Sequence, residues 1–259
     1  MRSHAIGVNM IVYYSQTGNT KYVANKLAAK TKERVLNLLD YSGEELVVSK
    51  EETLGIFAPV YCGGLPYSVL AFLETAKIKC EGYCYLFATY GNVSGRVGDI
   101  ANTYLQKNIG RKFDALFCAK MTDTWTPMFD LSNREEVLAI LKNAEFMIDS
   151  NIERILQKKQ GDFLVDKTLG FVGKTFLAVY NGLSKTAHLS VENTCVGCGL
   201  CEKNCPSKAI RMKDGKPVFV KENCDMCLGC LHKCPTFSIQ YKNKTKHHGQ
   251  YINPYVDLP

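Results

Sequence analysis

The chain has 259 residues, of which 46% are hydrophobic, 22% charged and 10% aromatic, and its formal charge is +7. This composition excludes a disordered or fibrous protein, and the length suits one large domain or two ordinary ones. No apolar run approaches the roughly 20 residues of a membrane span and no amino-terminal segment reads as a secretory signal, so we expect a cytoplasmic protein.

Strands and helices alternate through the first 160 residues. The expected strands are 8–14, 34–39, 54–60, 83–89 and 113–120, and the expected helices are 21–30, 67–77, 95–109 and 132–158. Strict alternation with short links favours an open α/β fold, in which helices cover both faces of a five-stranded parallel sheet of order 2-1-3-4-5. Ligands of such sheets bind beyond the carboxyl ends of the strands.

The loop after the first expected strand is a candidate anion site. Backbone N–H groups and hydroxyls of such a loop converge on a phosphate, and the dipole of the following helix favours its negative charge. An ordinary polar turn that caps a helix is the alternative interpretation. The loop consists of Ser15, Gln16, Thr17, Gly18, Asn19 and Thr20.

This loop has the form S/T-x-T-G-x-T and resembles the phosphate loop of flavodoxins, which binds FMN. The resemblance implies a flavodoxin-like sheet and two further flavin loops after the third and fourth strands. These loops are Pro59, Val60, Tyr61, Cys62, Gly63 and Gly64, and then Thr89, Tyr90, Gly91 and Asn92. Tyr61, Tyr90 and Trp125 are candidates for stacking on the flavin, with ordinary packing as the alternative for each.

Eight of the 12 cysteines form two copies of the pattern C-x2-C-x2-C-x3-C-P. Zinc sites use two spaced pairs, whereas three evenly spaced cysteines and a fourth before proline are typical of 4Fe-4S clusters. The fourth cysteine of each run ligates the other cluster. We therefore expect one cluster on Cys195, Cys198, Cys201 and Cys234, and a second on Cys224, Cys227, Cys230 and Cys205.

The cysteine region resembles bacterial two-cluster ferredoxins, with a small α+β fold and a hairpin at about 209–220 between the repeats. The expected domains are an FMN-binding domain at 1–160, a linker with a packing helix at 161–188, and a ferredoxin domain with a carboxyl-terminal tail at 189–259. The other cysteines are interpreted as buried thiols, with a redox pair at Cys80 and Cys84 as the alternative.

A flavodoxin part followed by a ferredoxin part resembles the flavodoxin–ferredoxin fusion proteins of anaerobes (EFR-type ferredoxins). The resemblance implies an electron carrier that holds FMN and two 4Fe-4S clusters and serves redox partner proteins. The alternative is a flavin-dependent reductase of a quinone, nitro compound or corrinoid, although the flavin loops offer no recognisable catalytic acid or nucleophile. The chain has no second nucleotide-binding unit for NAD(P)H, and its dispersed positive residues do not favour nucleic acid.

Overall fold

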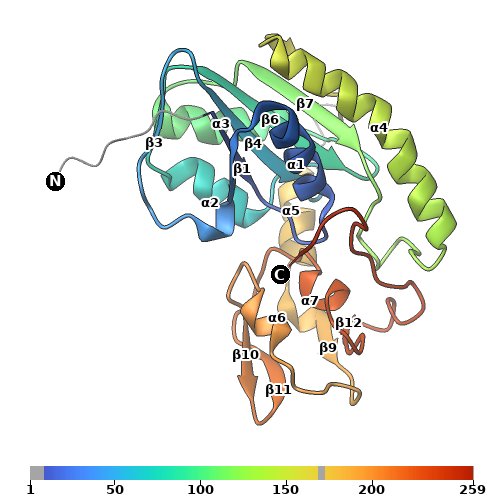
Figure 1. The fold of residues 1–259 in the computed structure, drawn as a ribbon. Coiled ribbons are helices and arrows are strands. Elements are labelled where there is room, and N and C mark those ends of the chain that lie inside the picture. The colour runs from blue at the N-terminus through green and yellow to red at the C-terminus, as the bar shows by residue number, and fades with distance from the viewer. Residues whose placement is uncertain (1–8, 169–172, 259) are drawn as a thin grey trace.

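A six-stranded parallel sheet forms the centre of the first half of the molecule (Figure 1). The computed structural model describes residues 9–168 and 173–258, so residues 1–8 of the expected first domain and 169–172 of the expected linker lie outside the described residues. The sheet order is β2-β1-β4-β6-β7-β8. The strands are β1 (Met10–Tyr13), β2 (Arg34–Asn37), β4 (Thr53–Pro59), β6 (Tyr83–Tyr90), β7 (Ala115–Lys120) and β8 (Gly161–Asp162).

The first five of these strands confirm the predicted order 2-1-3-4-5. The sixth, β8, pairs with β7 through only two residues, which is too short for a periodicity to reveal. An isolated bridge between Gly95 and Lys167 follows it. The chain therefore stays beside the first sheet beyond residue 160.

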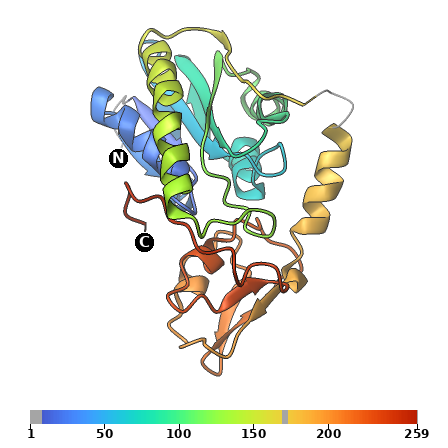
Figure 2. The same cartoon turned by 90° about the vertical axis from the view of Figure 1, so that its right-hand side faces the viewer.

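Two pairs of helices cover the sheet (Figure 2). They are α1 (Asn19–Thr31), α2 (Tyr67–Thr75), α3 (Val97–Ile109) and α4 (Arg134–Leu156). Residues Val12 and Ile56 pack on one face with α2 and α3, whereas Ile11 and Phe57 pack on the other with α1 and α4. Because both faces are buried, β6 is buried at every position, as expected for a central parallel strand.

A second, smaller parallel sheet joins β3 (Leu46–Val48) to β5 (Ile78–Cys80). Sequence patterning missed it, because three-residue strands carry too little alternation. A short 3-10 helix, η1 (Leu38–Asp40), precedes β3.

The cysteine repeats lie in a compact second half built from short elements. The hairpin of β10 (Ile210–Lys213) and β11 (Lys216–Phe219) confirms the prediction between the repeats, and β9 (Leu189–Val191) pairs antiparallel with β12 (Ile239–Tyr241). The helical elements are α5 (Gly173–Leu183), η3 (Thr186–His188), α6 (Leu200–Lys203) and α7 (Gly229–His232). Within the part of the chain that is described, no helix is long and apolar enough to cross a membrane.

Helix α5 and the carboxyl-terminal tail are two of the segments that join the two halves. Helix α5 runs along the side of the molecule (Figure 2), where the ring of Tyr180 stacks on Tyr67 of α2 at 4.5 Å between centroids. The carboxyl-terminal tail, which we define as residues 249–258, returns from the second half to α1 (Figure 1). These contacts place the carboxyl edge of the sheet against the second cysteine repeat.

Candidate functional site

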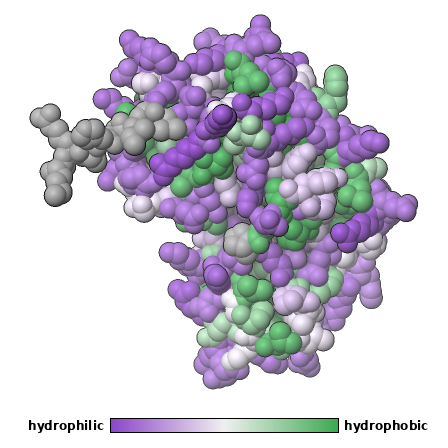
Figure 3. All heavy atoms as spheres, in the orientation of Figure 1, coloured by the Kyte–Doolittle hydropathy of each residue, from purple (hydrophilic) through white to green (hydrophobic). Residues whose placement is uncertain are grey.

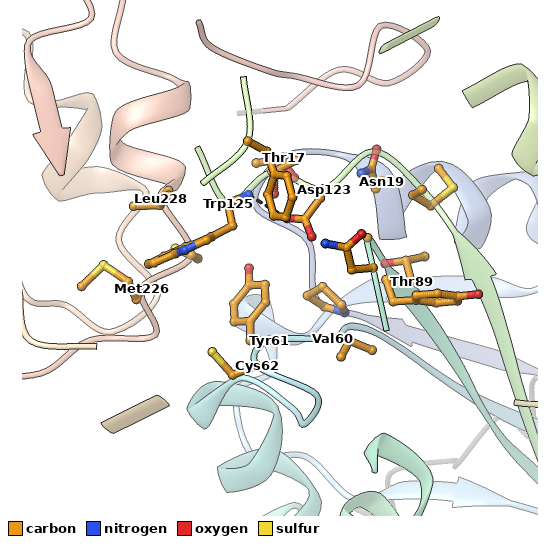
Figure 4. Close-up of a pocket in the computed structure, with 18 of the residues that line it drawn as sticks. Thr17, Asn19, Val60, Tyr61, Cys62, Thr89, Asp123, Trp125, Met226 and Leu228 are labelled. Atoms are coloured by element: carbon orange, nitrogen blue, oxygen red, sulfur yellow. Dashed lines mark hydrogen bonds between the residues drawn. The ribbon is translucent and has the colours of Figure 1, made fainter. Parts of the chain in front are cut away.

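A cavity of about 450 Å³ lies at the carboxyl ends of the parallel strands, where ligands of this fold class bind. The loops after β1, β4, β6 and β7 line it, and Figure 4 shows their side chains around it. All the predicted flavin-loop residues line this cavity except Gly18 and Gly64. Four sequence segments that are far apart in the chain thus meet at one site.

The phosphate loop has the backbone of an anion cradle. Gly18 caps α1 with a φ of +99° and its N–H donates to Ser15 Oγ at 3.2 Å. The hydroxyls of Thr20 and Thr89 lie 2.7 Å apart and tie this loop to the one after β6. The first turn of α1 contains no acidic residue, so its dipole is free to favour a bound anion.

Gln16 carries a buried polar atom toward this site. Its side chain is 4% exposed, and Oε1 has no hydrogen-bond partner among the described residues. It packs so closely on Gly229 of α7 that a Cβ there would lie 2.9 Å from Oε1. An unpaired, buried hydrogen-bond acceptor on a residue of the cavity wall suits a polar cofactor that can donate to it, since such an atom is costly without a partner.

The three aromatic candidates have different surroundings. Tyr61 and Trp125 line the cavity and are half-buried, and Figure 4 shows Trp125 beside Met226 and Leu228. Tyr90 also lines the cavity, but its ring belongs to the core and its hydroxyl donates to Asp166 Oδ2 at 2.9 Å. The position of Tyr90 therefore favours ordinary core packing, whereas the positions of Tyr61 and Trp125 are better suited to stacking on a flavin.

Sequence reasoning missed Asp123, which lies on the loop after β7. Its Oδ1 accepts a hydrogen bond from the Trp125 N–H at 2.9 Å, and burial raises the pKa of its carboxyl above the usual range. Gly91 makes room for it, since a Cβ there would lie 2.2 Å from Asp123 Oδ2. The rule that ligands bind beyond carboxyl strand ends could have identified this loop.

Cys62 also lines the cavity, but as a protonated thiol. Burial, and then the nearby Asp123, raise its pKa to about 11. A thiol in that state is a poor nucleophile at neutral pH. Cys62 therefore fits a wall residue better than a reactive group.

The remaining wall of the cavity comes from the second half of the chain. Met226, Cys227 and Leu228 of the second cysteine repeat line it, together with residues of α5. No local sequence pattern could have identified these residues, because their approach depends on how the two halves pack.

Two further cavities divide the eight repeat cysteines into sets of four. One is lined by Cys205, Cys224, Cys227 and Cys230, and the other by Cys195, Cys198, Cys201 and Cys234. These are the sets expected from the spacing. The four cysteines of each set line a common cavity. Within 9–168 and 173–258, by contrast, no group of three or more His, Cys, Asp or Glu side chains is close enough together to hold a single metal ion.

Asp225, between two cysteines of the second repeat, connects the halves. It is 2% exposed, and its Oδ2 accepts hydrogen bonds from Tyr14 Oη at 2.7 Å and Ser68 Oγ at 2.6 Å. The Ser68 N–H donates to Oδ1 at 3.2 Å, while the Tyr180 hydroxyl donates to the Asp225 carbonyl at 2.8 Å. Burial raises the pKa of this carboxyl, and the bonds from Ser68 and Tyr14 oppose that shift.

His232 and the tail make a second connection. His232 Nε2 lies 2.9 Å from the Thr124 carbonyl oxygen, its Nδ1 lies 3.2 Å from the Tyr251 nitrogen, and burial lowers its pKa to about 4. Farther along the tail, the Asn253 N–H donates to the Thr17 carbonyl at 2.8 Å, and its Nδ2 donates to Asn19 Oδ1 at 3.0 Å. The tail thus holds the phosphate loop from outside.

Comparison with protein families gives two matches that do not overlap. Residues 10–149 match the flavodoxin domain, and residues 188–235 match the 4Fe-4S dicluster domain. A flavodoxin domain implies a bound flavin, and the second domain implies 4Fe-4S chemistry. The two matches cover the phosphate loop and all eight repeat cysteines.

Curated relatives and solved structures share only parts of this chain. An uncharacterised polyferredoxin-like protein of Methanocaldococcus jannaschii is 30% identical over 94 residues, which are 31% of this chain and 56% of that protein. An uncharacterised ferredoxin of the same organism is 43% identical over 47 residues, or 18% and 31% of the two chains. The Trp repressor binding protein of Bacillus subtilis aligns with a TM-score of 0.34 and 13% identity, over 59% of this chain and 100% of that one.

The chain thus spans about half or less of the length of these curated relatives. The flavodoxin match itself extends over more than half of the chain and agrees with the strand order and the phosphate loop. The protein belongs to the flavodoxin domain family and carries, after that domain, a 4Fe-4S dicluster ferredoxin domain.

Proposed function

We propose that this protein is an electron carrier that binds FMN in the large cavity and two 4Fe-4S clusters in the two cysteine-lined cavities. When bound, the flavin exchanges two electrons and each cluster exchanges one, so the chain would connect two-electron and one-electron partners. The domain division at 1–160, 161–188 and 189–259 is part of this proposal, with the first residues of the linker (161–167) lying beside the sheet of the first domain. A reducing cytoplasm is the proposed location, because it keeps cysteine thiols reduced.

One observation carries this proposal. Met226, Cys227 and Leu228 line both the large cavity and the cavity of Cys205, Cys224, Cys227 and Cys230. A single loop would therefore separate the flavin from this cluster. An independent flavodoxin and ferredoxin joined by a linker would have no such common wall.

The phosphate loop would hold the FMN phosphate with its backbone N–H groups and with the hydroxyls of Ser15 and Thr17, at the positive end of the α1 dipole. Tyr61 and Trp125 would bound the flavin ring, and the half-buried wall between them would exclude water. The eight repeat cysteines would ligate the clusters in the two sets given above.

We propose that the cluster held by Cys195, Cys198, Cys201 and Cys234 is the one that exchanges electrons with the external partner. Cys198 is exposed, and a Cβ on Gly197 would lie 2.6 Å from the Gly215 carbonyl at the tip of the β10–β11 hairpin. Figure 3 shows hydrophobic side chains on this lower part of the molecule. The large hydrophobic residues exposed in the described part of this half include Val196, Leu200, Val218 and Val220.

Three lysines lie on α6 and the β10–β11 hairpin, the elements that also carry Leu200 and Val218. Lys203, Lys213 and Lys216 are exposed, and none of them has an ion-pair partner in the described part of the chain. An apolar centre with unpaired positive charges at its rim suits a partner protein with an acidic surface. We therefore expect the partner's association rate to fall as salt concentration rises.

The proposal is tested by cofactor content and by the choice of acceptor. We expect about eight iron atoms, about eight acid-labile sulfides and one FMN for each chain, as two 4Fe-4S clusters and one flavin require. After anaerobic reduction, stopped-flow oxidation by acidic redox proteins should be fast and salt-sensitive. A zinc-containing, colourless protein would overturn the cluster assignment. Saturable turnover with one quinone, nitro compound or corrinoid would instead support the reductase alternative.

Asp123→Asn should change how the flavin potential depends on pH. Because burial raises the pKa of Asp123, its carboxyl stays neutral above the usual value of about 3.9, and it places a negative charge in the cavity only as pH rises through its folded value. That charge opposes electron addition. Below this transition the two proteins should have equal potentials, and above it the Asn variant should be higher by some tens of millivolts.

The measurement is spectroelectrochemical titration of the bound flavin over a series of pH values. Asp130→Asn is the matched control, since Asp130 follows the same strand but is exposed, and its pKa is lowered by Ser132. Parallel curves for Asp123→Asn and the native protein would show that Asp123 exerts no charge effect on the flavin. The free energy of unfolding of the native protein should also fall as pH rises through the folded pKa of Asp123, because the buried carboxyl then becomes charged.

A further inference from the structure

Cys80 and Cys84 lie together at the edge of the sheet opposite the flavin loops. Cys80 ends β5 and is half-buried, whereas Cys84 lies near the amino end of β6 and is fully buried. Gly82, between them, packs closely on a neighbouring segment, because a Cβ there would lie 2.3 Å from the carbonyl oxygens of Ser49 and Glu52. The cofactor sites use neither cysteine.

Arg111 is held against this pair. Its Nη1 donates to the carbonyl oxygens of Cys80 at 3.0 Å and Gly82 at 2.9 Å, and it lies 3.9 Å from Cys80 Sγ. Asp114 fixes the other nitrogen, Nη2, at 2.5 Å. A guanidinium positioned in this way stabilises a thiolate on Cys80.

The two thiols are polarised in opposite directions. A hydrogen bond from Cys84, assisted by Arg111 and the Gly82 backbone, lowers the pKa of Cys80 despite its burial. The same hydrogen bond, together with burial, raises the pKa of Cys84 well above the usual value. One sulfur is thus prepared as a nucleophile, and its hydrogen-bonded neighbour four residues on is a protonated thiol, an arrangement that neither Cys62 nor Cys118 has.

We propose that Cys80 and Cys84 form a reactive dithiol that exchanges with low-molecular-weight disulfides. The Cys80 thiolate attacks one sulfur of the disulfide, forms a mixed disulfide and releases the first thiolate of the oxidant. Cys84 then loses its proton and attacks Cys80 Sγ, which closes the Cys80–Cys84 disulfide and releases the second. The two protein thiols lose two electrons, and the small disulfide gains them with two protons to become two thiols.

The test uses the intact holoprotein and glutathione disulfide under anaerobic conditions, with cluster absorbance monitored throughout. After denaturation and alkylation, mass spectrometry should find the peptide with Cys80 and Cys84 internally linked and unalkylated. Cys84→Ser should stop at a glutathione adduct on Cys80, and Cys80→Ser should form neither product. Cys62 and Cys118, whose pKa values are raised to about 11, should remain free and alkylated.

Arg111 supplies a second readout. In Arg111→Gln, the first step should slow at neutral pH, by about tenfold for each unit by which the pKa of Cys80 rises, and Arg111→Lys should restore part of the rate. If Cys80 reacts no faster than Cys62 and Cys118, or if the native protein stops at the mixed adduct, the dithiol proposal is wrong. Neither outcome affects the proposed electron-carrier function.

Discussion

Removing the two side chains that bind Asp225 from the flavodoxin side should uncouple the cofactor sites. In the Tyr14→Phe, Ser68→Ala double variant, a carboxyl that is 2% exposed loses the hydroxyls at 2.7 Å and 2.6 Å. A buried acceptor left without its partners costs about 1–3 kcal/mol for each bond. We expect docking of the halves to weaken by about 3 kcal/mol, which is about 100-fold in the docked-to-undocked ratio.

The measurement is the rate at which electrons pass between flavin and clusters, followed by stopped-flow absorbance at the two cofactors' wavelengths. Both substituted positions lie outside the cysteine repeats, and neither side chain lines the large cavity, so iron and FMN content should stay unchanged. The control is Tyr83→Phe with Ser42→Ala, which removes a hydroxyl bound to the Lys159 carbonyl and an exposed one, both away from the boundary. Unchanged internal transfer in the Tyr14, Ser68 variant would show that these bonds do not hold the halves in their productive arrangement.

Gly18→Ala should release FMN while leaving the clusters in place. Gly18 has a φ of +99°, which costs a residue with a Cβ about 1–2 kcal/mol. That Cβ would also lie 2.8 Å from Asn253 Cβ and Val256 Cγ2, so the tail must move away from the phosphate loop. The phosphate loop and the tail shift to relieve this strain, and the shifted loop holds the phosphate less well, so we expect a loss of up to about 3 kcal/mol in FMN binding, or about 100-fold in Kd.

Gly43→Ala is a close control, because Gly43 has a φ of +95° and nothing lies within 4 Å of its Cβ position. The Gly43→Ala variant has the same unfavourable positive φ but no steric clash, and residue 43 does not line the cavity. FMN affinity is measured by quenching of flavin fluorescence on titration, and cluster content by iron analysis. Equal FMN affinity in the two variants would show that the contact between Gly18 and the tail does not support flavin binding.

The five long strands, the phosphate loop and the cluster motifs followed from the sequence because each depends on neighbouring residues, and the order of the strands followed from the fold class that their alternation with helices favours. Runs such as Leu54–Val60 are apolar because both faces of a central parallel strand are buried. The cysteine spacing is set by the size of a cluster that one loop must surround, so the motif is visible without a fold. The hairpin at 210–219 was predictable for the same reason, since Asp214 and Gly215 form its turn locally.

Short or distant elements were not predictable in this way. The strands β3, β5 and β8 have two or three residues, which is less than one readable period. Asp123 looked like an ordinary loop residue until the fold placed it beside Gly91. The tail likewise had no motif, although Asn253 contacts Asn19 across 234 positions of the chain.

The sequence by itself therefore determined which cofactor chemistries this protein is built for, since a phosphate loop and a cluster loop are each local structures with their own residue patterns. Only the tertiary structure decided that the flavin cavity and one cluster cavity share a wall. The contacts of Tyr14 with Asp225, and of Gln16 with Gly229, join residues more than 200 positions apart. Their partners are chosen by burial and hydrogen bonding at the boundary, which no local spacing encodes.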